Sequence, residues 1–156
     1  DYDDEIRQQL SHVVASVHQL STWRARDEVE NTEALIKAIE DPTCTILGHP
    51  TGRILQVREG YDVDMHAVLR RMGELNAEGE LKSVEINASP YRLDLDWRFC
   101  HFARDQGVPV CINPDAHDTT GLRNVWFGVQ MARKGWLEPK DLLNCYTGEE
   151  IESMLR

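Results

Sequence analysis

Histidine, carboxylate and carboxamide side chains end each of four apolar, strand-like runs in this chain. Imidazole nitrogens and carboxylate oxygens are donors that manganese, zinc and iron accept in proteins. A parallel α/β sheet or barrel brings the carboxyl ends of its strands to one face, so residues far apart in the sequence converge there. The pattern therefore predicts one shared metal site at that face. The candidate residues at the strand ends are His18, His49, Glu85, Asn87, Asp115 and His117.

The segment Asp115-Ala116-His117 is the most specific of these motifs. On an extended segment its carboxylate and imidazole point to the same side, which suits one metal or two adjacent ones. In Gly48-His49-Pro50 the glycine permits an unusual backbone angle and the proline stops the strand, which holds the imidazole at a sharp exit. Taken singly, these histidines are more typical of hydrogen-bonded structural residues, and Asp115 of a turn. Convergence of the strand ends favours metal ligation instead.

Three further histidines serve as internal controls, because one precedes its strand and two lie in predicted helices. None of them is expected to bind metal. They are His12, His66 and His101.

Glu85 and Asn87 share one face at the end of their strand. There they are expected to support a metal ligand, orient a water or touch the substrate. The alternative is that the two side chains are hydrogen-bonded at the protein surface and have no role in a site. Trp23 lies in the loop just after His18, where a hydrophobic anchor is favoured over a role in lining the cleft.

Arg53 and Arg92 follow two of these strands closely. A planar guanidinium group binds two phosphate oxygens at once, so both arginines are candidates for substrate binding. The alternative is a salt bridge to Asp94 or Asp96.

Length and charge narrow the classes of function. The chain has 156 residues, enough for one compact domain with a core, and no apolar run approaches the length of a membrane span. A soluble, cytoplasmic protein is therefore expected. The formal net charge of −10 argues against diffuse binding to a nucleic-acid backbone by this chain alone. It permits an enzyme that acts on phosphates, because bound divalent cations supply positive charge locally.

Motifs of several other enzyme classes are missing from the sequence. There is no Gly-x-Gly-x-x-Gly run, no lysine loop of the Walker type and no Gly-x-Ser-x-Gly turn. Dinucleotide-binding, nucleoside-triphosphatase and serine-hydrolase functions therefore have no support.

The 4 cysteines lie far apart and form no Cys-x-x-Cys pair, which argues against a zinc ribbon or a dithiol redox centre. Buried, reduced thiols are expected for all of them. They are Cys44, Cys100, Cys111 and Cys145.

Strand and helix patterns alternate along the chain, which favours an α/β fold with a parallel sheet. The predicted strands end near Val17 and span 45–47, 83–87 and 108–112. The predicted helices span 3–10, a segment around 34–39, 63–77, 95–106, 122–134, 139–144 and 148–155, with Gly79 and Gly107 as stops.

Taken in order, the motifs resemble the polymerase and histidinol phosphatase (PHP) domain, in the version found at the carboxyl end of bacterial family X DNA polymerases. The resemblance runs through nearly the whole chain. It rests on residues 15–18, 48–53, 85–97 and 113–117, which read ASVH, GHPTGR, EINASPYRLDLDW and NPDAH, with Phe127-Gly128 and Gly135-Trp136-Leu137 downstream.

The resemblance implies a fold and a set of metal ligands. Residues 1–156 would form a partial PHP phosphoesterase domain, the carboxyl-terminal part of a distorted (β/α)7 barrel. His18 and His49 match ligands of one metal, Asp115 a ligand of a second and His117 a ligand of a third, with Asp115 and His117 at the catalytic centre. The family's amino-terminal His-x-His motif and its other upstream ligands have no counterpart here. Pro114 also stands where the family usually has a hydroxyl residue.

The same resemblance implies activity, cofactors and partners. The complete domain would be a phosphoesterase dependent on manganese or zinc, with up to three ions. It would act as a 3′→5′ exonuclease, as a 3′-phosphatase and in abasic-site cleavage during DNA repair. Its partners would be DNA 3′ ends, reached through the parent polymerase, and the remainder of the same polypeptide. The alternatives are a phosphatase of the histidinol-phosphate type and a non-catalytic structural or interaction module.

Overall fold

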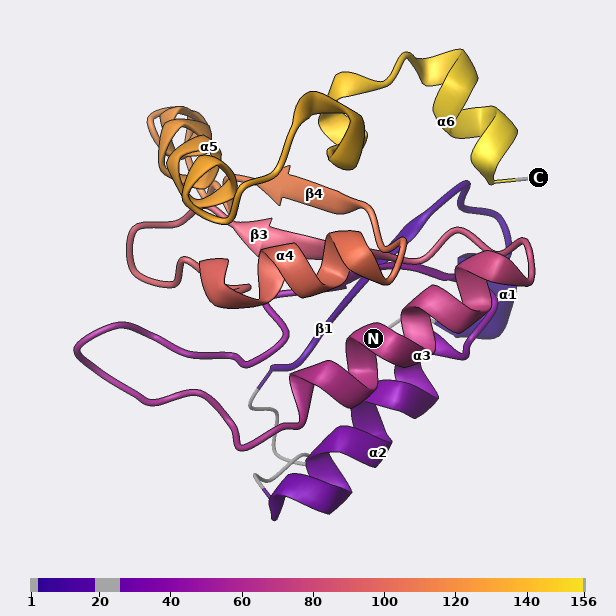
Figure 1. The fold of residues 1–156 in the computed structure, drawn as a ribbon, viewed down its shortest axis with the longest axis horizontal. Coiled ribbons are helices and arrows are strands. Elements are labelled where there is room, and N and C mark those ends of the chain that lie inside the picture. Colours follow the sequence, from indigo (N-terminus) through magenta and orange to yellow (C-terminus); the bar gives the residue numbers. More distant parts are fainter. Residues whose placement is uncertain (1–2, 19–25, 156) are drawn as a thin grey trace.

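Four parallel strands, hydrogen-bonded in chain order, form a sheet in this computed structural model, which describes residues 3–18 and 26–155 (Figure 1). Trp23 lies outside the described residues. The register places Ser16 beside Gly48 and Asn87 beside Asn113, so β1 ends level with β2 and β3 ends level with β4. Leu47 pairs with Val84, so β3 extends beyond the end of β2. The predicted parallel α/β fold is confirmed. The strands are β1 (Val13–Ser16), β2 (Cys44–Gly48), β3 (Ser83–Asn87) and β4 (Val110–Asn113).

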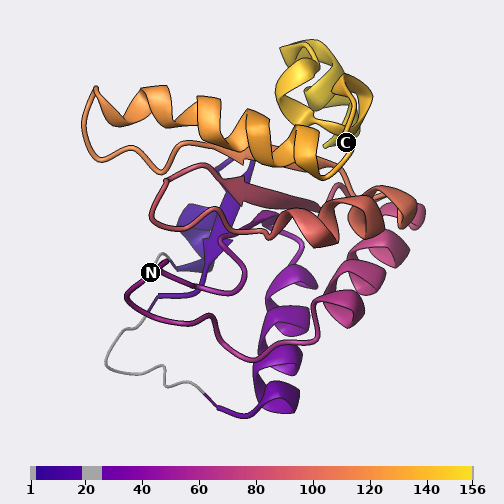
Figure 2. The same ribbon diagram turned by 60° about the vertical axis from the view of Figure 1, so that its left-hand side comes forward.

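Helices join consecutive strands and cover one face of the sheet. Figures 1 and 2 show α2, α3 and α4 as one layer against the strands, and each of these helices contacts the next. No helix of the described residues is long and apolar enough to span a membrane. The helices are α1 (Asp4–Arg7), α2 (Glu28–Ile39), α3 (Met65–Ala77), α4 (Trp97–Asp105), α5 (Val125–Lys134) and α6 (Gly148–Met154).

Aspartates set the beginnings of the helices in this layer. The side chains of Asp27, Asp64 and Asp96 each accept a hydrogen bond from a backbone N–H in the first turn of α2, α3 and α4. Helices predicted from residues 63 and 95 therefore begin later, just after their caps. Gly79 (φ 97°) and Gly107 (φ 72°) lie just beyond α3 and α4 in the left-handed region, which confirms them as the stops.

The chain after β4 is less regular than its sequence pattern predicts. The expected helix over 122–134 opens with the 3-10 turn Gly121–Asn124 before α5 begins. The segment 139–144 forms the 3-10 turns Pro139–Asp141 and Leu143–Cys145. The second of these turns leaves Cys145 exposed, so the prediction that all the thiols are buried is wrong for this residue.

The two faces of the sheet bury different residues. Side chains alternate along a strand, so Val84 and Ile86 face the helices while Glu85 and Asn87 face the opposite side. The large core lies on the helix side, where Val84 and Ile86 pack with apolar residues of α2, α3, α4 and α5. The second face carries a small cluster of Ile46, Cys111 and Leu143. The polar residues of β3 therefore lie on the less filled side of the sheet.

Gly128 lets α5 approach the sheet closely. A Cβ atom there would lie 2.4 Å from Cγ2 of Ile112 and 2.8 Å from Cβ of Ala88. Gly128→Ala is therefore expected to lower the free energy of unfolding by about 1–3 kcal/mol, despite alanine's higher helix propensity. Urea denaturation measures the loss. The matched control is Gly148→Ala in α6, where nothing lies within 4 Å and a change below about 0.5 kcal/mol is expected. Equal stability of the two variants would contradict this packing.

The cysteines should differ sharply in reactivity. Burial raises the pKa of the Cys100 thiol to about 12 and that of Cys111 to about 11, and it also raises the pKa of Cys44. In the native protein an aromatic disulfide reagent should react rapidly with Cys145. The other three thiols of this chain should react only after denaturation. Cys145→Ser should remove the rapid phase. Rapid labelling that survives this substitution would contradict the burial of the other thiols.

Candidate metal centre

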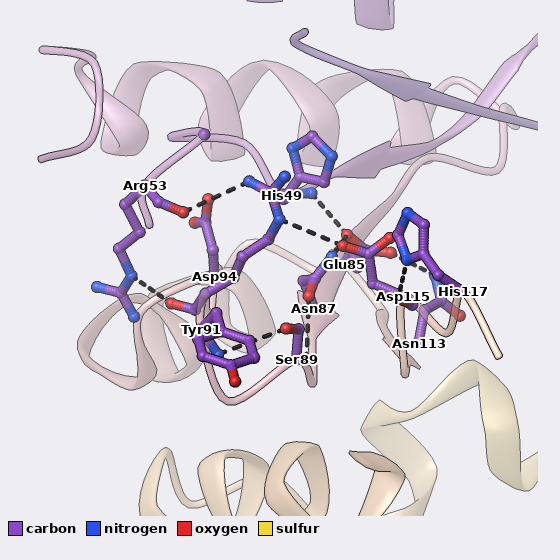
Figure 3. Close-up of polar contacts among 12 residues, drawn as sticks. His49, Arg53, Glu85, Asn87, Ser89, Tyr91, Asp94, Asn113, Asp115 and His117 are labelled. Carbon is purple, nitrogen blue, oxygen red and sulfur yellow. Dashed lines mark hydrogen bonds and ion pairs between the residues drawn. The ribbon is translucent and has the colours of Figure 1, made fainter. Parts of the chain in front are cut away.

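The polar strand ends meet at the carboxyl edge of the sheet, as the sequence predicts. His18 follows β1 and His49 follows β2, and the centroids of their rings lie 5.2 Å apart. Figure 3 shows side chains from the ends of β2, β3 and β4 gathered at this edge, among them His49, Glu85, Asn87, Asn113, Asp115 and His117.

His49 is held at the exit of β2 with one ring nitrogen unpartnered among the described residues. Its backbone lies in the left-handed region (φ 25°), directly after Gly48, and its side chain is buried. The ring Nδ1 is buried without a hydrogen-bond partner among the described residues. Burial, and then the charge of Arg92, lower the pKa of the His49 imidazole to about 4. A neutral imidazole with a free nitrogen is the form that binds a metal ion.

Glu85 fixes the position of His49. Its carboxylate accepts a hydrogen bond from the backbone N–H of His49 (2.7 Å) and one from Nδ2 of Asn113 (2.8 Å). Nδ2 of Asn87 donates a third, at 3.3 Å. Burial raises the pKa of Glu85. The alternative of a surface pair is wrong, because Glu85 and Asn87 are only 5% and 1% exposed.

Gly48 is required by the same arrangement. A Cβ at this position would lie 2.3 Å from Oγ of Ser16 and 3.5 Å from Oε2 of Glu85. A larger residue at this position would therefore collide with side chains of β1 just before the two histidines.

Asp115 and His117 lie on the other side of the site, in a less extended segment than the sequence predicts. The backbone of Asp115 is left-handed (φ 51°), a conformation that aspartate tolerates better than most residues. This segment is therefore not a continuation of strand β4. Nε of Arg92 donates to Oδ2 of Asp115 (3.2 Å), and Nδ1 of the exposed His117 lies 2.9 Å from the carbonyl oxygen of Asp115.

The two candidate arginines both form ion pairs. Arg53 pairs with Asp96 (2.8 Å) and also donates to the backbone carbonyls of Arg92 and Leu93. This is the salt bridge that the sequence left as the alternative for Arg53. Arg92 pairs instead with Asp115. Arg53 therefore fixes the loop that carries Arg92.

Two residues of the candidate site are not predicted by the sequence pattern. Asn113 stands in the motif before Asp115 with no assigned role, and its register beside Asn87 places it on the same face as Glu85. Asp94 is fully buried, and its Oδ2 accepts hydrogen bonds from the N–H (3.0 Å) and the hydroxyl (2.9 Å) of Thr51. It thereby joins the loop after β2 to the loop after β3. No sequence pattern distinguishes it from Asp96.

The control histidines have other surroundings. The ring of His66 packs against Phe99 and Phe102, and His101 pairs with Asp105 within α4. His12 lies beside Ser11 before β1.

Among the described residues, no three His, Cys, Asp or Glu side chains form a group that could hold a metal ion. The paired rings of His18 and His49, with an unpartnered nitrogen on His49, nevertheless fit a divalent metal as two of its ligands. The carboxylate of Asp115, just after β4, is a further candidate ligand, and it is held by Arg92.

Comparisons with known proteins agree with the motifs. The DNA polymerase/3′-5′ exonuclease PolX of Bacillus subtilis (strain 168) is 35% identical over 156 residues, which is 100% of this chain and 26% of that protein. A probable phosphatase of Caldanaerobacter subterraneus subsp. tengcongensis is 32% identical over 123 residues, 75% of this chain and 44% of that protein. One from Clostridium acetobutylicum is 28% identical over 125 residues, 80% of this chain and 48% of that protein.

This chain thus spans about a quarter of the polymerase and less than half of each phosphatase. No family model matches the chain. The similarity to PolX along the whole of this chain, together with the parallel α/β sheet, confirms the resemblance that the motifs indicate. In sequence this chain is similar to part of PolX, and its alternating parallel sheet and helices are consistent with part of a PHP domain of the kind found in bacterial family X DNA polymerases.

Proposed function

We propose that this chain contributes metal ligands to a PHP phosphoesterase that removes nucleotides or a terminal phosphate from DNA 3′ ends, as part of a family X DNA polymerase in DNA repair. The observation that carries the proposal is the His18–His49 pair, with the buried, unpartnered Nδ1 of His49 at the carboxyl edge of a parallel sheet. The names of the relatives support phosphoester hydrolysis as the reaction, since exonucleases and phosphatases both cleave such bonds.

In this proposal His18 and His49 hold one metal, and Asp115 and His117 contribute to further metals. Manganese and zinc both suit imidazole and carboxylate donors. A bound divalent cation would supply Lewis acidity and the positive charge that a phosphate ester requires. Glu85 acts indirectly, because it fixes the backbone at His49 rather than offering a free oxygen.

Arg92 would contribute to phosphate binding. Its guanidinium group lies between Oδ2 of Asp115 and the carbonyl oxygen of Arg53, to which it donates at 3.2 and 3.4 Å. Arginine carries five N–H donors, so these two bonds leave others for a phosphate oxygen. Its position matters in a chain of net charge −10, which offers a DNA backbone little attraction elsewhere.

A second candidate is a phosphatase for a small phosphomonoester such as histidinol phosphate. It is favoured by the probable phosphatases among the relatives. The two candidate functions are separated by hydrolysis rates measured with the full natural protein and Mn²⁺. The substrates are a 3′-phosphorylated oligonucleotide, an unphosphorylated oligonucleotide and histidinol phosphate.

The proposed function predicts faster hydrolysis of the oligonucleotides and loss of that activity in excess chelator. Faster hydrolysis of histidinol phosphate would establish the second candidate instead. Failure to hydrolyse any of the three, with Mn²⁺ or with Zn²⁺, would leave a structural or interaction module.

A further inference from the structure

Tyr91 presents an exposed aromatic ring on a backbone that is held in place. Its side chain belongs to the loop between β3 and α4, and the residue is 71% exposed. The backbone carbonyl of Tyr91 accepts a hydrogen bond from the N–H of Leu55 (2.7 Å), and its own N–H donates to Oγ of Ser89 (3.4 Å). Figure 3 shows the ring on the loop that carries Ser89 and Asp94, beside the candidate metal centre. Its attachment to the protein is therefore fixed although the ring is open to solvent.

The same tyrosine lines a pocket shared with the site. The pocket has a volume of about 450 Å³, and Tyr91, Asp115, His117 and Asn124 are among its lining residues. Pockets of about 300–1,000 Å³ are usual for small-molecule ligands, so there is room here for more than a phosphate group. A substrate whose phosphate lies at Asp115 and His117 would therefore bring its next group to the ring of Tyr91.

Asp118 also lines this pocket, but its carboxylate is occupied by hydrogen bonds within its own turn. Oδ1 of Asp118 accepts hydrogen bonds from the hydroxyl of Thr120 (2.7 Å) and the N–H of Gly121 (2.8 Å). This carboxylate closes a turn and is not arranged to distinguish one base from another. Stacking on an aromatic face tolerates every base, because each base has a π-face.

We propose that Tyr91 is the stacking platform for the base of the 3′-terminal nucleotide, a specificity residue that favours nucleotide ends over phosphoesters without an aromatic group. The proposal rests on the proposed phosphoesterase function and deepens it by naming a residue that selects among its substrates. Stacking would also supply affinity that a chain of net charge −10 cannot draw from the DNA backbone.

The test compares two oligonucleotides that differ only at the 3′-terminal residue, which carries either a base or an abasic tetrahydrofuran. In the full natural protein with Mn²⁺, Tyr91→Ala should raise KM about tenfold for the oligonucleotide that ends in a base, with kcat unchanged. For the abasic oligonucleotide, neither KM nor kcat should change. Tyr91→Phe should behave as the wild type. The matched control is Trp136→Ala, since Trp136 is 74% exposed and does not line this pocket.

A binding measurement separates this proposal from the proposed function. Fluorescence of a 3′-terminal 2-aminopurine should be quenched by the wild type and by Tyr91→Phe, and recover in Tyr91→Ala. If no variant hydrolyses DNA but this quenching pattern holds, the phosphoesterase function fails and the stacking platform stands. If Tyr91→Ala raises KM equally for the two oligonucleotides, or raises it for neither, the platform is overturned. The phosphoesterase function would remain intact in both cases.

Discussion

Replacing Glu85 by alanine should lower the free energy of unfolding by about 3 kcal/mol or more. The substitution removes the acceptor of three hydrogen bonds, so the backbone N–H of His49 and the amides of Asn87 and Asn113 lose their partner inside the protein. A buried donor left unsatisfied costs about 1–3 kcal/mol. Urea denaturation, followed by circular dichroism, gives the difference from the wild type.

Two further variants isolate the cause. Glu85→Gln keeps one acceptor oxygen and should lose less stability than Glu85→Ala. Glu33→Ala removes an exposed glutamate of α2 and should change the stability by less than about 0.5 kcal/mol. If Glu85→Ala unfolds at the same urea concentration as Glu33→Ala, the carboxylate of Glu85 does not hold the strand ends together.

Replacing His49 by alanine should reduce the hydrolysis of DNA 3′ ends by at least about 100-fold. Even residues that only orient a metal ligand change affinity or activity by about 10–100-fold, and His49 is proposed to bind the metal itself. Steady-state rates in Mn²⁺, with the metal content of the purified protein measured in parallel, test this. The proposal requires that rate and metal content fall together.

Because His49 is buried, a loss of folding must be separated from a loss of ligation. His18 is exposed, so His18→Ala should keep the circular dichroism of the wild type and still lose metal and activity. His101→Ala removes an exposed histidine of α4 and should retain both. A folded His49→Ala protein that keeps its metal and its rate would refute the assignment of this ligand.

The sequence predicts the fold and the edge of the sheet where the candidate site residues meet. Apolar runs separated by helical periodicity are enough for a parallel sheet, and chain direction then places His18 and His49 at the same edge. Their rings do lie together in the structure. The stops at Gly79 and Gly107 were also predictable, because a left-handed residue after a helix is most often glycine.

The role of Glu85 could not be predicted from the sequence. The alternation of side chains along a strand predicts which residues share a face of the sheet, but not whether that face is buried. Glu85 is buried between the exit of β2 and the amide of Asn113, a contact between strands that only the register reveals. Arg53 and Arg92 follow similar strand ends, and only the folded loop decides that one pairs with Asp96 and the other with Asp115.

The backbone at Asp115 and the exposure of Cys145 were missed for a related reason. Both residues follow apolar stretches, which predict an extended segment after β4 and a buried thiol. The left-handed conformation of Asp115 and the 3-10 turn that ends at Cys145 are local conformations that hydrophobic periodicity does not reveal. Arrangements of loops relative to one another were therefore the least predictable part of this site.

Anomalous scattering from crystals of the full natural protein grown with Mn²⁺ tests the central claim most directly. The account predicts an anomalous peak in contact with a ring nitrogen of both His18 and His49, and a further peak at the carboxylate of Asp115. Peaks only at sites remote from the carboxyl edge of the sheet, with the rings of His18 and His49 bound to no metal, would contradict it.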